Sequence, residues 1–317
     1  QIISVTSAPQ SGYSTRKMNA GLIRNRGVEL SLGGMPVSTK NWKWEMNFNI
    51  AKNSNKLVEL ADGVDSYSIY WTSFTTRLYN YAMVGKSLGV ITGNTWERDD
   101  NGNIIFHELS ASQKALYGGE YVPTYNQNTL DELGNFHPDF TGGFNTSISF
   151  KNFRLSANID FSVGGQIVSY TNMWGSSSGI LDKTAELNDR GVNVREPVSK
   201  GGGIHMTGVD QDGNKVDTYV NAKLYYTTAS RVWEEWVYDR TYVKLREVSL
   251  SYVFPSQTLK KLNIGLSRAS VAINASNPWL IYSACPNVDV SEIGMGYFEG
   301  GNAAATRSIG FTVNLAF

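Results

Sequence analysis

Apolar and polar residues alternate over the last twelve positions of the chain, 306–317. The odd-numbered positions are apolar except for Arg307, and the even-numbered positions hold Thr, Ser, Gly, Asn and Ala. Side chains of a β-strand point alternately to opposite faces, so the segment is predicted to be a strand with one apolar and one polar face.

The same alternation recurs in six earlier segments of similar length. About ten residues, tilted by roughly 45°, cross the hydrocarbon layer of a bilayer, so the pattern predicts an all-β protein of the transmembrane antiparallel β-barrel class. The edge amides of an open sheet would lack partners in lipid, so the barrel must close. Seven strands do not close alone, and further strands must come from sequence outside this chain. The predicted strands are 27–33, 41–51, 140–150, 153–164, 242–254, 266–276 and 306–317.

One predicted strand changes phase along its length. In 242–254 the apolar positions are even-numbered from Val248 onward, whereas Val243 and Leu245 are odd-numbered. An extra residue in a strand reverses its faces, so we expect either a β-bulge near Arg246 or the exit of the strand from the membrane at this point.

The connections between the predicted strands alternate between short and long. The short ones are 34–40, 151–152 and 255–265, and the long ones are roughly 53–139, 165–240 and 277–304. Outer-membrane barrels have short periplasmic turns and long extracellular loops. This pattern predicts an outer-membrane location, with the long loops extracellular and the C-terminus periplasmic.

A soluble β-sandwich also alternates apolar and polar residues, and it stays open as an alternative. The barrel is favoured because the polar faces are rich in Asn, Ser, Thr and Gly, and because only 18% of the residues are charged. Aromatic residues also lie at the strand ends, where a membrane-interface girdle is expected. These residues are Trp42, Trp44, Phe150, Phe153, Tyr252, Phe254 and Phe317.

The composition narrows the possible partners. The 28 basic and 28 acidic residues cancel, which disfavours a nucleic-acid partner. The single cysteine, Cys285, excludes an intrachain disulfide, and no run of eighteen apolar residues predicts a transmembrane helix. The first residues, from Gln1 onward, are typical of the end of a strand, so we expect the chain to be part of a longer product.

The sequence contains no constellation that predicts catalysis or metal binding. His107, His137 and His205 each lie without a partner three or four residues away, so we predict a protein that is not an enzyme and carries no metal or cofactor. The segments 99–103 and 210–214 resemble calcium loops, but they lack Gly at the sixth and Glu at the twelfth position. We predict that each is a tight turn closing a small hairpin.

Two loop segments are candidates for substrate binding, because aromatic faces stack on sugar rings and amides bind hydroxyl groups. The first contains Tyr67, Tyr70, Trp71, Phe74, Tyr79 and Tyr81, and the second runs from Tyr170 to Trp174. We select Trp71, Tyr79, Asn172 and Trp174. The alternative is that these residues pack loop against loop or against a partner protein, since large interfaces are rich in Tyr and Trp. Trp233 and Trp236 are expected to begin a strand or a short helix.

Five blocks of sequence, in family order, resemble the SusC-like TonB-dependent outer-membrane transporters. The third of them fits the pattern Y-[VL]-[KR]-[LI]-[RK]-[ENL]-[VI]-[ST]-L-[SG]-Y-x-[FL]-P of that family, while the fourth has NPW where the family usually has NLW. The blocks are Asn19–Leu30 (NAGLIRNRGVEL), Pro138–Phe144 with Phe150–Phe153 (PDFTGGF, FKNF), Tyr242–Pro255 (YVKLREVSLSYVFP), Asn277–Trp279 (NPW) and Thr306–Phe317 (TRSIGFTVNLAF).

The resemblance implies that residues 1–317 are the C-terminal portion of a 22-stranded barrel from a Bacteroidota-type outer membrane. The plug domain, the TonB box and the earlier strands are then absent from this chain. Such proteins import glycan or peptide oligomers, driven by the TonB–ExbB–ExbD complex, beneath a SusD-like surface lipoprotein. The resemblance also implies that Phe317 is the sorting signal for the barrel-assembly machinery, while a plain interfacial anchor is the alternative. Two other functions stay open: a TonB-dependent receptor for a metal chelate or cobalamin-like cofactor, and a soluble carbohydrate-binding β-sandwich.

Overall fold

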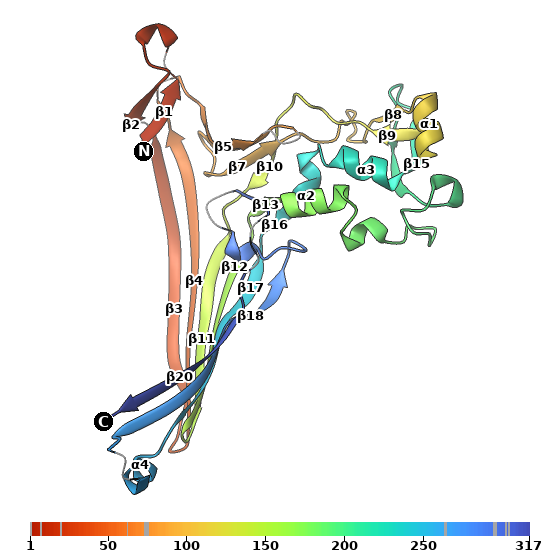
Figure 1. Ribbon diagram of the computed structural model, residues 1–317. Helices are drawn as coiled ribbons and strands as arrows, with labels where there is room; N and C mark the ends of the chain where they lie inside the picture. The colour runs from red at the N-terminus through yellow and green to blue at the C-terminus, as the bar shows by residue number, and fades with distance from the viewer. Residues whose placement is uncertain are drawn as a thin grey trace.

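The computed structural model describes residues 2–6, 8–19, 21–61, 63–72, 76–262, 265–293, 297–301, 303 and 305–317. Gln1, Ala20 and Phe74 of the sequence analysis lie outside the described residues. The described residues form two regions: a long antiparallel sheet, which we call the wall, and a folded region at one end of it, which we call the lobe (Figure 1).

The wall is a seven-stranded sheet in which every neighbouring pair is antiparallel, in the order β20-β18-β17-β12-β11-β4-β3. All seven strands predicted from the alternation are present. The short turns and the C-terminus lie at the end of the wall away from the lobe (Figure 1). The strands are β3 (Leu22–Ser38), β4 (Trp42–Glu59), β11 (Phe140–Phe150), β12 (Phe153–Val163), β17 (Tyr242–Val253), β18 (Arg268–Ser283) and β20 (Ser308–Ala316).

Four strand ends differ from the prediction by more than two residues, and the first of them is the start of β3, at Leu22 in place of 27. β3 continues through Gly34 to Ser38, so the first turn is not 34–40 but begins after Ser38. The register of β3 with β4 shifts between Gly34 and Val37, so a β-bulge absorbs the residues that resemble a turn. β4 and β18 likewise run several residues beyond their predicted ends, into the lobe.

The apolar face of the wall is not covered by any of the described residues. The row Ile148, Leu155, Leu250, Ile273 and Phe311 crosses five strands in register, and Leu250 and Phe311 are 47% and 79% exposed. A β-sandwich would bury such a row beneath a second sheet, so the soluble sandwich alternative is wrong for this fold. A contiguous exposed apolar surface of this kind suits lipid.

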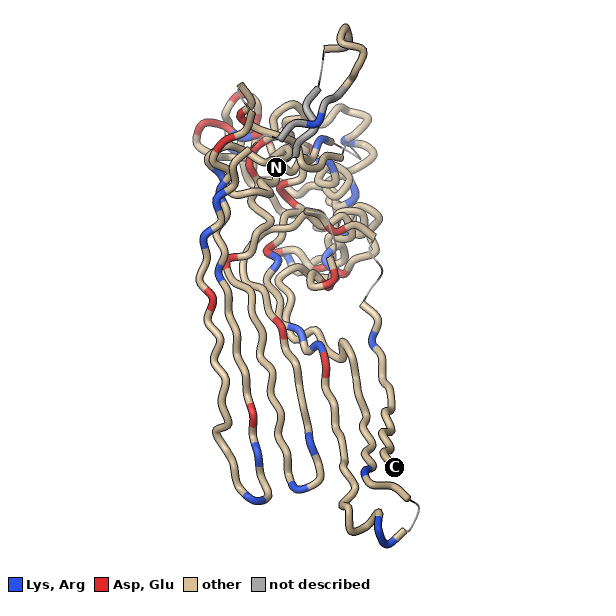
Figure 2. The backbone as a smooth tube through the Cα atoms, turned by 90° about the vertical axis from the view of Figure 1, so that its left-hand side faces the viewer, with Lys and Arg blue, Asp and Glu red and all other residues tan. Residues whose placement is uncertain are grey.

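Aromatic residues gather at the turn end of the wall, as the sequence predicts. The rings of Trp42 and Phe150 lie 4.3 Å apart, and those of Phe153 and Tyr252 lie 4.7 Å apart. Lys and Arg residues mark the turns at this end, while the middle of the wall carries few charges (Figure 2). This distribution fits a girdle at a membrane interface.

The bulge expected near Arg246 is confirmed. The pairing of β12 with β17 passes from Asn158–Glu247 directly to Ile159–Leu245, which leaves Arg246 without a partner in the ladder. The extra residue keeps Leu245 and Val248 on the same face although their numbers differ in parity.

The lobe is built from the three long connections, 60–139, 164–241 and 284–307. Its strands form a four-stranded sheet, a three-stranded sheet and two small hairpins. They are β5 (Ser66–Thr72), β6 (Leu78–Met83), β7 (Val90–Gly93) and β10 (Asp131–Asn135); β13 (Gln166–Ser169), β16 (Val237–Asp239) and β19 (Phe298–Glu299); β8 (Phe106–Glu108) with β9 (Tyr121–Pro123); and β14 (Ile204–Val209) with β15 (Lys215–Val220).

The helices are short. Three lie in the lobe, α1 (Ala111–Tyr117), α2 (Tyr170–Ser177) and α3 (Ala222–Ala229), and α4 (Ser256–Leu262) lies in a turn of the wall. Single 3-10 turns occupy Pro9–Ser11, Asp182–Ala185, Val198–Lys200, Trp233–Trp236 and Val290–Glu292, and near the N-terminus β1 (Ile2–Thr6) pairs with β2 (Thr15–Asn19). In the described part of the chain, no helix combines the length and apolar character needed to span a membrane.

The lobe has its own hydrophobic core. Trp233 and Trp236 are buried at its centre, so the short helix predicted for them is present and faces inward. The cluster joins residues of all three connections, including Trp96 from the first and Phe298 from the third. β13 of the second connection also pairs with β19 of the third, and the shared core adds the first connection, so the three loops fold as one unit.

Candidate functional site

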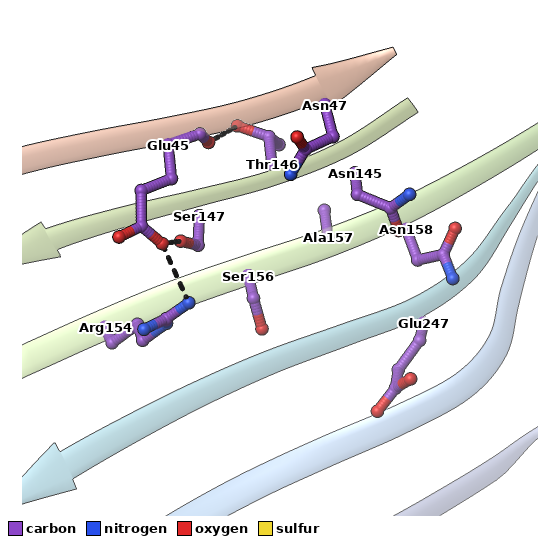
Figure 3. A pocket seen from close by; sticks show the side chains of 10 residues that line it. All are labelled: Glu45, Asn47, Asn145, Thr146, Ser147, Arg154, Ser156, Ala157, Asn158 and Glu247. Carbon is purple, nitrogen blue, oxygen red and sulfur yellow. Dashed lines mark hydrogen bonds and ion pairs between the residues drawn. The ribbon is translucent and has the colours of Figure 1, made fainter. Parts of the chain in front are cut away.

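The polar face of the wall carries an open hollow of about 270 Å³. Figure 3 shows Glu45 beside Arg154 and Ser147, with the carboxamides of Asn145 and Asn158 farther along the same face. The Arg154 guanidinium and the Ser147 hydroxyl each donate to Glu45 Oε2, at 3.2 Å. This surface offers donors and acceptors to a polar solute.

A buried lysine ties the lobe to the polar face of the wall. Lys244 of β17 has 2% of its side chain exposed, and its Nζ lies 2.7 Å from Asp289 Oδ2 and 2.7 Å from Glu292 Oε1. Arg246 pairs with Glu292 and, at 2.9 Å, with Asp160 of β12. We call these five side chains the rim network. The third connection is thereby held over the polar face.

The rim network keeps its two loop carboxylates ionised. Burial acts to raise the pKa of Asp289, but hydrogen bonds from Lys244 and Ser291 outweigh it and lower that pKa. A hydrogen bond from Lys244 is the main cause that lowers the pKa of Glu292. Sequence reasoning missed this network, although the phase change at Arg246 marked its position. A buried Lys is tolerated only where such partners compensate its charge.

The aromatic segment of the first connection forms a two-faced hairpin, β5–β6. Trp71 and Tyr79 are paired directly across it with ring centroids 6.4 Å apart, and Tyr79 stacks on Tyr81 at 5.2 Å. We call these three residues the aromatic ladder. Trp71 is 59% exposed, so the ladder presents ring faces to solvent.

The opposite face of this hairpin anchors it to the lobe core. Leu78, Asn80 and Ala82 alternate with the ladder residues and are buried. Tyr70 stacks on Phe298 at 4.8 Å, and Phe298 contacts Tyr170 in the core. The ladder is therefore held on a fixed support, which suits a binding surface.

The other two predicted site residues lie on α2, and they differ from each other. Asn172 is fully buried: its Nδ2 donates to Ser169 Oγ and to Pro286 O, both at 2.9 Å, and its Oδ1 accepts from Asn287. These bonds join the second and third connections and leave Asn172 no exposed surface. Trp174 is 43% exposed, and its ring lies 5.5 Å from that of Tyr170. The structure thus brings Trp71 and Tyr79 together and places Asn172 in the interior.

Two of the polar motifs have clear local roles. In segments 99–103 and 210–214 the first Asp carboxylate accepts from backbone N–H groups two and four residues later, so both are the tight turns expected. His205 has two acidic partners that the sequence analysis did not predict. Asp189 and Asp217 lie 2.9 and 2.8 Å from its two ring nitrogens, and both come from distant positions in the chain. Within the described residues, no group of three or more His, Cys, Asp or Glu side chains is arranged to hold a metal ion.

No protein-family model matches the chain. It is 27% identical over 88% of its length to the TonB-dependent receptor P3 of Formosa agariphila, and covers 26% of that protein. It is 38% identical over 47% of its length to the TonB-dependent receptor SusC of Bacteroides thetaiotaomicron, and covers 15% of it. The resemblance to SusC-like TonB-dependent receptors is confirmed. These relatives are receptors rather than enzymes.

Solved structures share the fold of this chain. The RagAB peptide importer in its "closed-closed" state matches all of this chain with a TM-score of 0.67 and 18% identity, and the chain covers 32% of that structure. Its "open-open" state gives a TM-score of 0.66 at 16% identity, with 31% covered. The chain therefore spans about a third or less of these proteins, and its wall is a segment of their kind of β-barrel.

Proposed function

We propose that residues 1–317 form the C-terminal barrel portion of an outer-membrane transporter that imports glycan or peptide oligomers. The observation that carries this proposal is the two-faced wall, which exposes an apolar row including Leu250 and Phe311 on one side and polar groups on the other. Such a wall fits a bilayer on its apolar side and water on its polar side. Similarity to SusC and to the RagAB peptide importer supports the import of oligomers.

The proposal includes an orientation and partners. The C-terminus and the short turns face the periplasm, and the lobe is extracellular. Energy comes from the TonB–ExbB–ExbD complex through a plug domain outside this chain, and a SusD-like lipoprotein sits on the lobe. The SusC and RagAB similarities support partners of this kind.

Within the lobe, we assign substrate contact first to Trp71 and Tyr79 of the aromatic ladder. Their ring faces are supported from behind and open to solvent, as stacking on a sugar ring or a peptide side chain requires. Trp174 is a second exposed ring. Asn172 acts by positioning α2 against the third connection, since its amide is committed inside the protein.

Uptake of labelled oligomers by cells that carry the full-length protein tests the proposal. Uptake should saturate and should stop when a protonophore removes the energy supply. Loss of one stacking contact, about 0.5–1.5 kcal/mol, predicts that Trp71→Ala raises the half-saturating concentration roughly two- to tenfold. Trp279→Ala is the matched control, because Trp279 is also 59% exposed but lies on the wall. Equal effects of the two variants would contradict the assignment, and uptake insensitive to the protonophore would contradict active import.

Phe317 is proposed as the sorting signal for barrel assembly. Its side chain is 85% exposed at the turn end of the wall, where another protein can read it. Deleting Phe317 from the full-length protein should lower its level in the outer membrane, measured by immunoblot of isolated membranes, while Phe317→Tyr should preserve it. Refolding into lipid vesicles separates the two roles: a sorting signal leaves the yield unchanged, and a simple interfacial anchor lowers it.

A further inference from the structure

The lobe contains a second hollow, distinct from the wall and from the aromatic ladder. Its volume is about 480 Å³, and it lies where the end of α1, the end of α2 and the start of α3 meet. Pockets for small molecules or single sugar units typically have about 300–1,000 Å³. We call it the α2–α3 pocket.

The charged side chains that line the α2–α3 pocket are both basic, Arg195 and Lys223. Neither forms an ion pair with another described residue. The hollow on the wall is different, since Glu45 and Glu247 line it together with Arg154. The α2–α3 pocket therefore offers uncompensated positive charge to a ligand.

Arg195 is held rigidly at the edge of this pocket. Its Nε donates to the Thr184 carbonyl at 2.8 Å, and its Nη2 donates to the Gly179 carbonyl. Its Nη1 has no hydrogen-bond partner among the described residues. Because the guanidinium is already fixed, binding an anion through Nη1 costs little side-chain entropy.

A buried hydroxyl in the pocket also lacks a partner. Ser176 lines the pocket and is 1% exposed, and its Oγ has no hydrogen bond in the described structure. Buried polar groups are normally satisfied, so an unpaired one beside a hollow indicates a position for a ligand atom. The start of α3 contributes less, because Asn221 Oδ1 already accepts from Lys223 N and Leu224 N.

We propose that the α2–α3 pocket binds a carboxylate on the imported oligomer. The carboxylate oxygens accept from Arg195 Nη1 and Lys223 Nζ, and the Ser176 hydroxyl donates to an oxygen of the same unit. Two substrates carry this chemistry: a glycan that contains hexuronate, and a peptide through its C-terminus. This inference rests on the proposed function, to which it adds the acidic character of the substrate.

Binding to the full-length protein in lipid nanodiscs tests the inference by calorimetry. The probes are a tri-hexuronate and its neutral tri-hexose counterpart, and a tripeptide with a free or an amidated C-terminus. The free carboxylate should improve affinity about tenfold or more in the pair that matches the substrate, and the gain should shrink at high salt. The pair that shows the gain identifies the source of the carboxylate.

Matched variants test whether the gain in affinity from the carboxylate arises in the α2–α3 pocket. Lys223→Gln should remove a roughly threefold to tenfold part of the carboxylate gain without disturbing the fold, because Lys223 Nζ has no partner to lose. Arg195→Gln should remove most of the gain, and Arg195→Lys should restore part of it. Arg190→Gln is the control, because Arg190 lies over the Tyr219 ring and does not line the pocket. Equal affinity for acidic and neutral probes would overturn the inference. If neutral oligomers are then still imported by cells, the proposed function stands without it.

Discussion

The wall and the lobe treat the same kinds of apolar residue in opposite ways. Phe311 in β20 of the wall is 79% exposed, whereas Phe106 and Trp233 in the lobe are buried completely or nearly so. Both arrangements remove apolar surface from water, one by contact with lipid and the other by a protein core. One chain thus has a region that is folded for lipid, the wall, and a region that is folded for water, the lobe.

The two regions also depend on different bonds. The wall is held by continuous backbone ladders, as in the eleven-residue register of β11 with β12. The lobe is held by side chains, with the indoles of Trp233 and Trp236 at its centre. We therefore expect substitutions to damage one region and spare the other.

The largest expected effect is in the lobe core. Trp233→Ala leaves a large void beside Tyr170 and should cost about 3–5 kcal/mol, enough to unfold the lobe locally. Protease added to intact cells should then cleave the lobe, while the heat-dependent gel migration of the barrel stays unchanged. Trp71→Ala is the exposed control and should leave protease resistance intact. Loss of the barrel together with the lobe would show that the two regions do not fold separately.

The second-largest loss of stability is expected from a charge placed on the apolar face of the wall. Leu250→Arg places a charge in the apolar row and should cost about 2–4 kcal/mol if the row lies near the centre of the bilayer. Ser251→Arg, one residue along on the polar face, should cost much less. The urea midpoint of barrel unfolding in vesicles measures both. Equal midpoints would contradict the assignment of the two faces.

A smaller effect is expected where the two regions meet. Lys244→Met leaves Asp289 and Glu292 with fewer partners and should cost roughly 1–3 kcal/mol, because both carboxylates are partly solvated. Amide hydrogen exchange in residues 284–293 should become faster. Lys86→Met removes an ion pair that is about half exposed and should change exchange little. Unchanged exchange in 284–293 would show that other contacts hold the third connection.

The smallest expected effect is a dependence on pH of the stability of residues 284–293, where the lobe meets the wall. The pKa values of Asp289 and Glu292 are lower in the folded state, so their stabilisation is present above the ordinary carboxylate value of about 4. It is lost as the pH falls through their lowered values. The protection of the amides in 284–293, relative to their intrinsic exchange rates at each pH, should therefore fall below about pH 4 in the wild type. In Lys244→Met this loss of protection should be smaller, and an identical pH profile would contradict the role of Lys244.

The sequence predicts the wall well because strand alternation is a local property. The seven strands and the bulge at Arg246 follow from the parity of nearby residues. The extension of β3 was missed because Gly34, Met35 and Pro36 favour a turn locally, whereas the ladder with β4 continues past them.

The lobe was predicted less well because its contacts join distant segments. Trp71 and Tyr79 could be chosen as a pair, since both lie in one aromatic segment. The burial of Asn172 depends on Pro286 and Asn287, more than a hundred residues later, so no local pattern reveals it. The acidic partners of His205 and of Lys244 were hidden for the same reason.

The bulge at Arg246 sets which face of the wall each residue of β17 occupies. Below it, even-numbered residues such as Val248 meet lipid, and above it the odd-numbered Leu245 does so. Pairing every residue of β17 without this bulge would turn Lys244 toward the hydrocarbon and release the acidic loop it holds. In this strand one unpaired residue therefore decides which of the side chains beyond it face inside and which face outside.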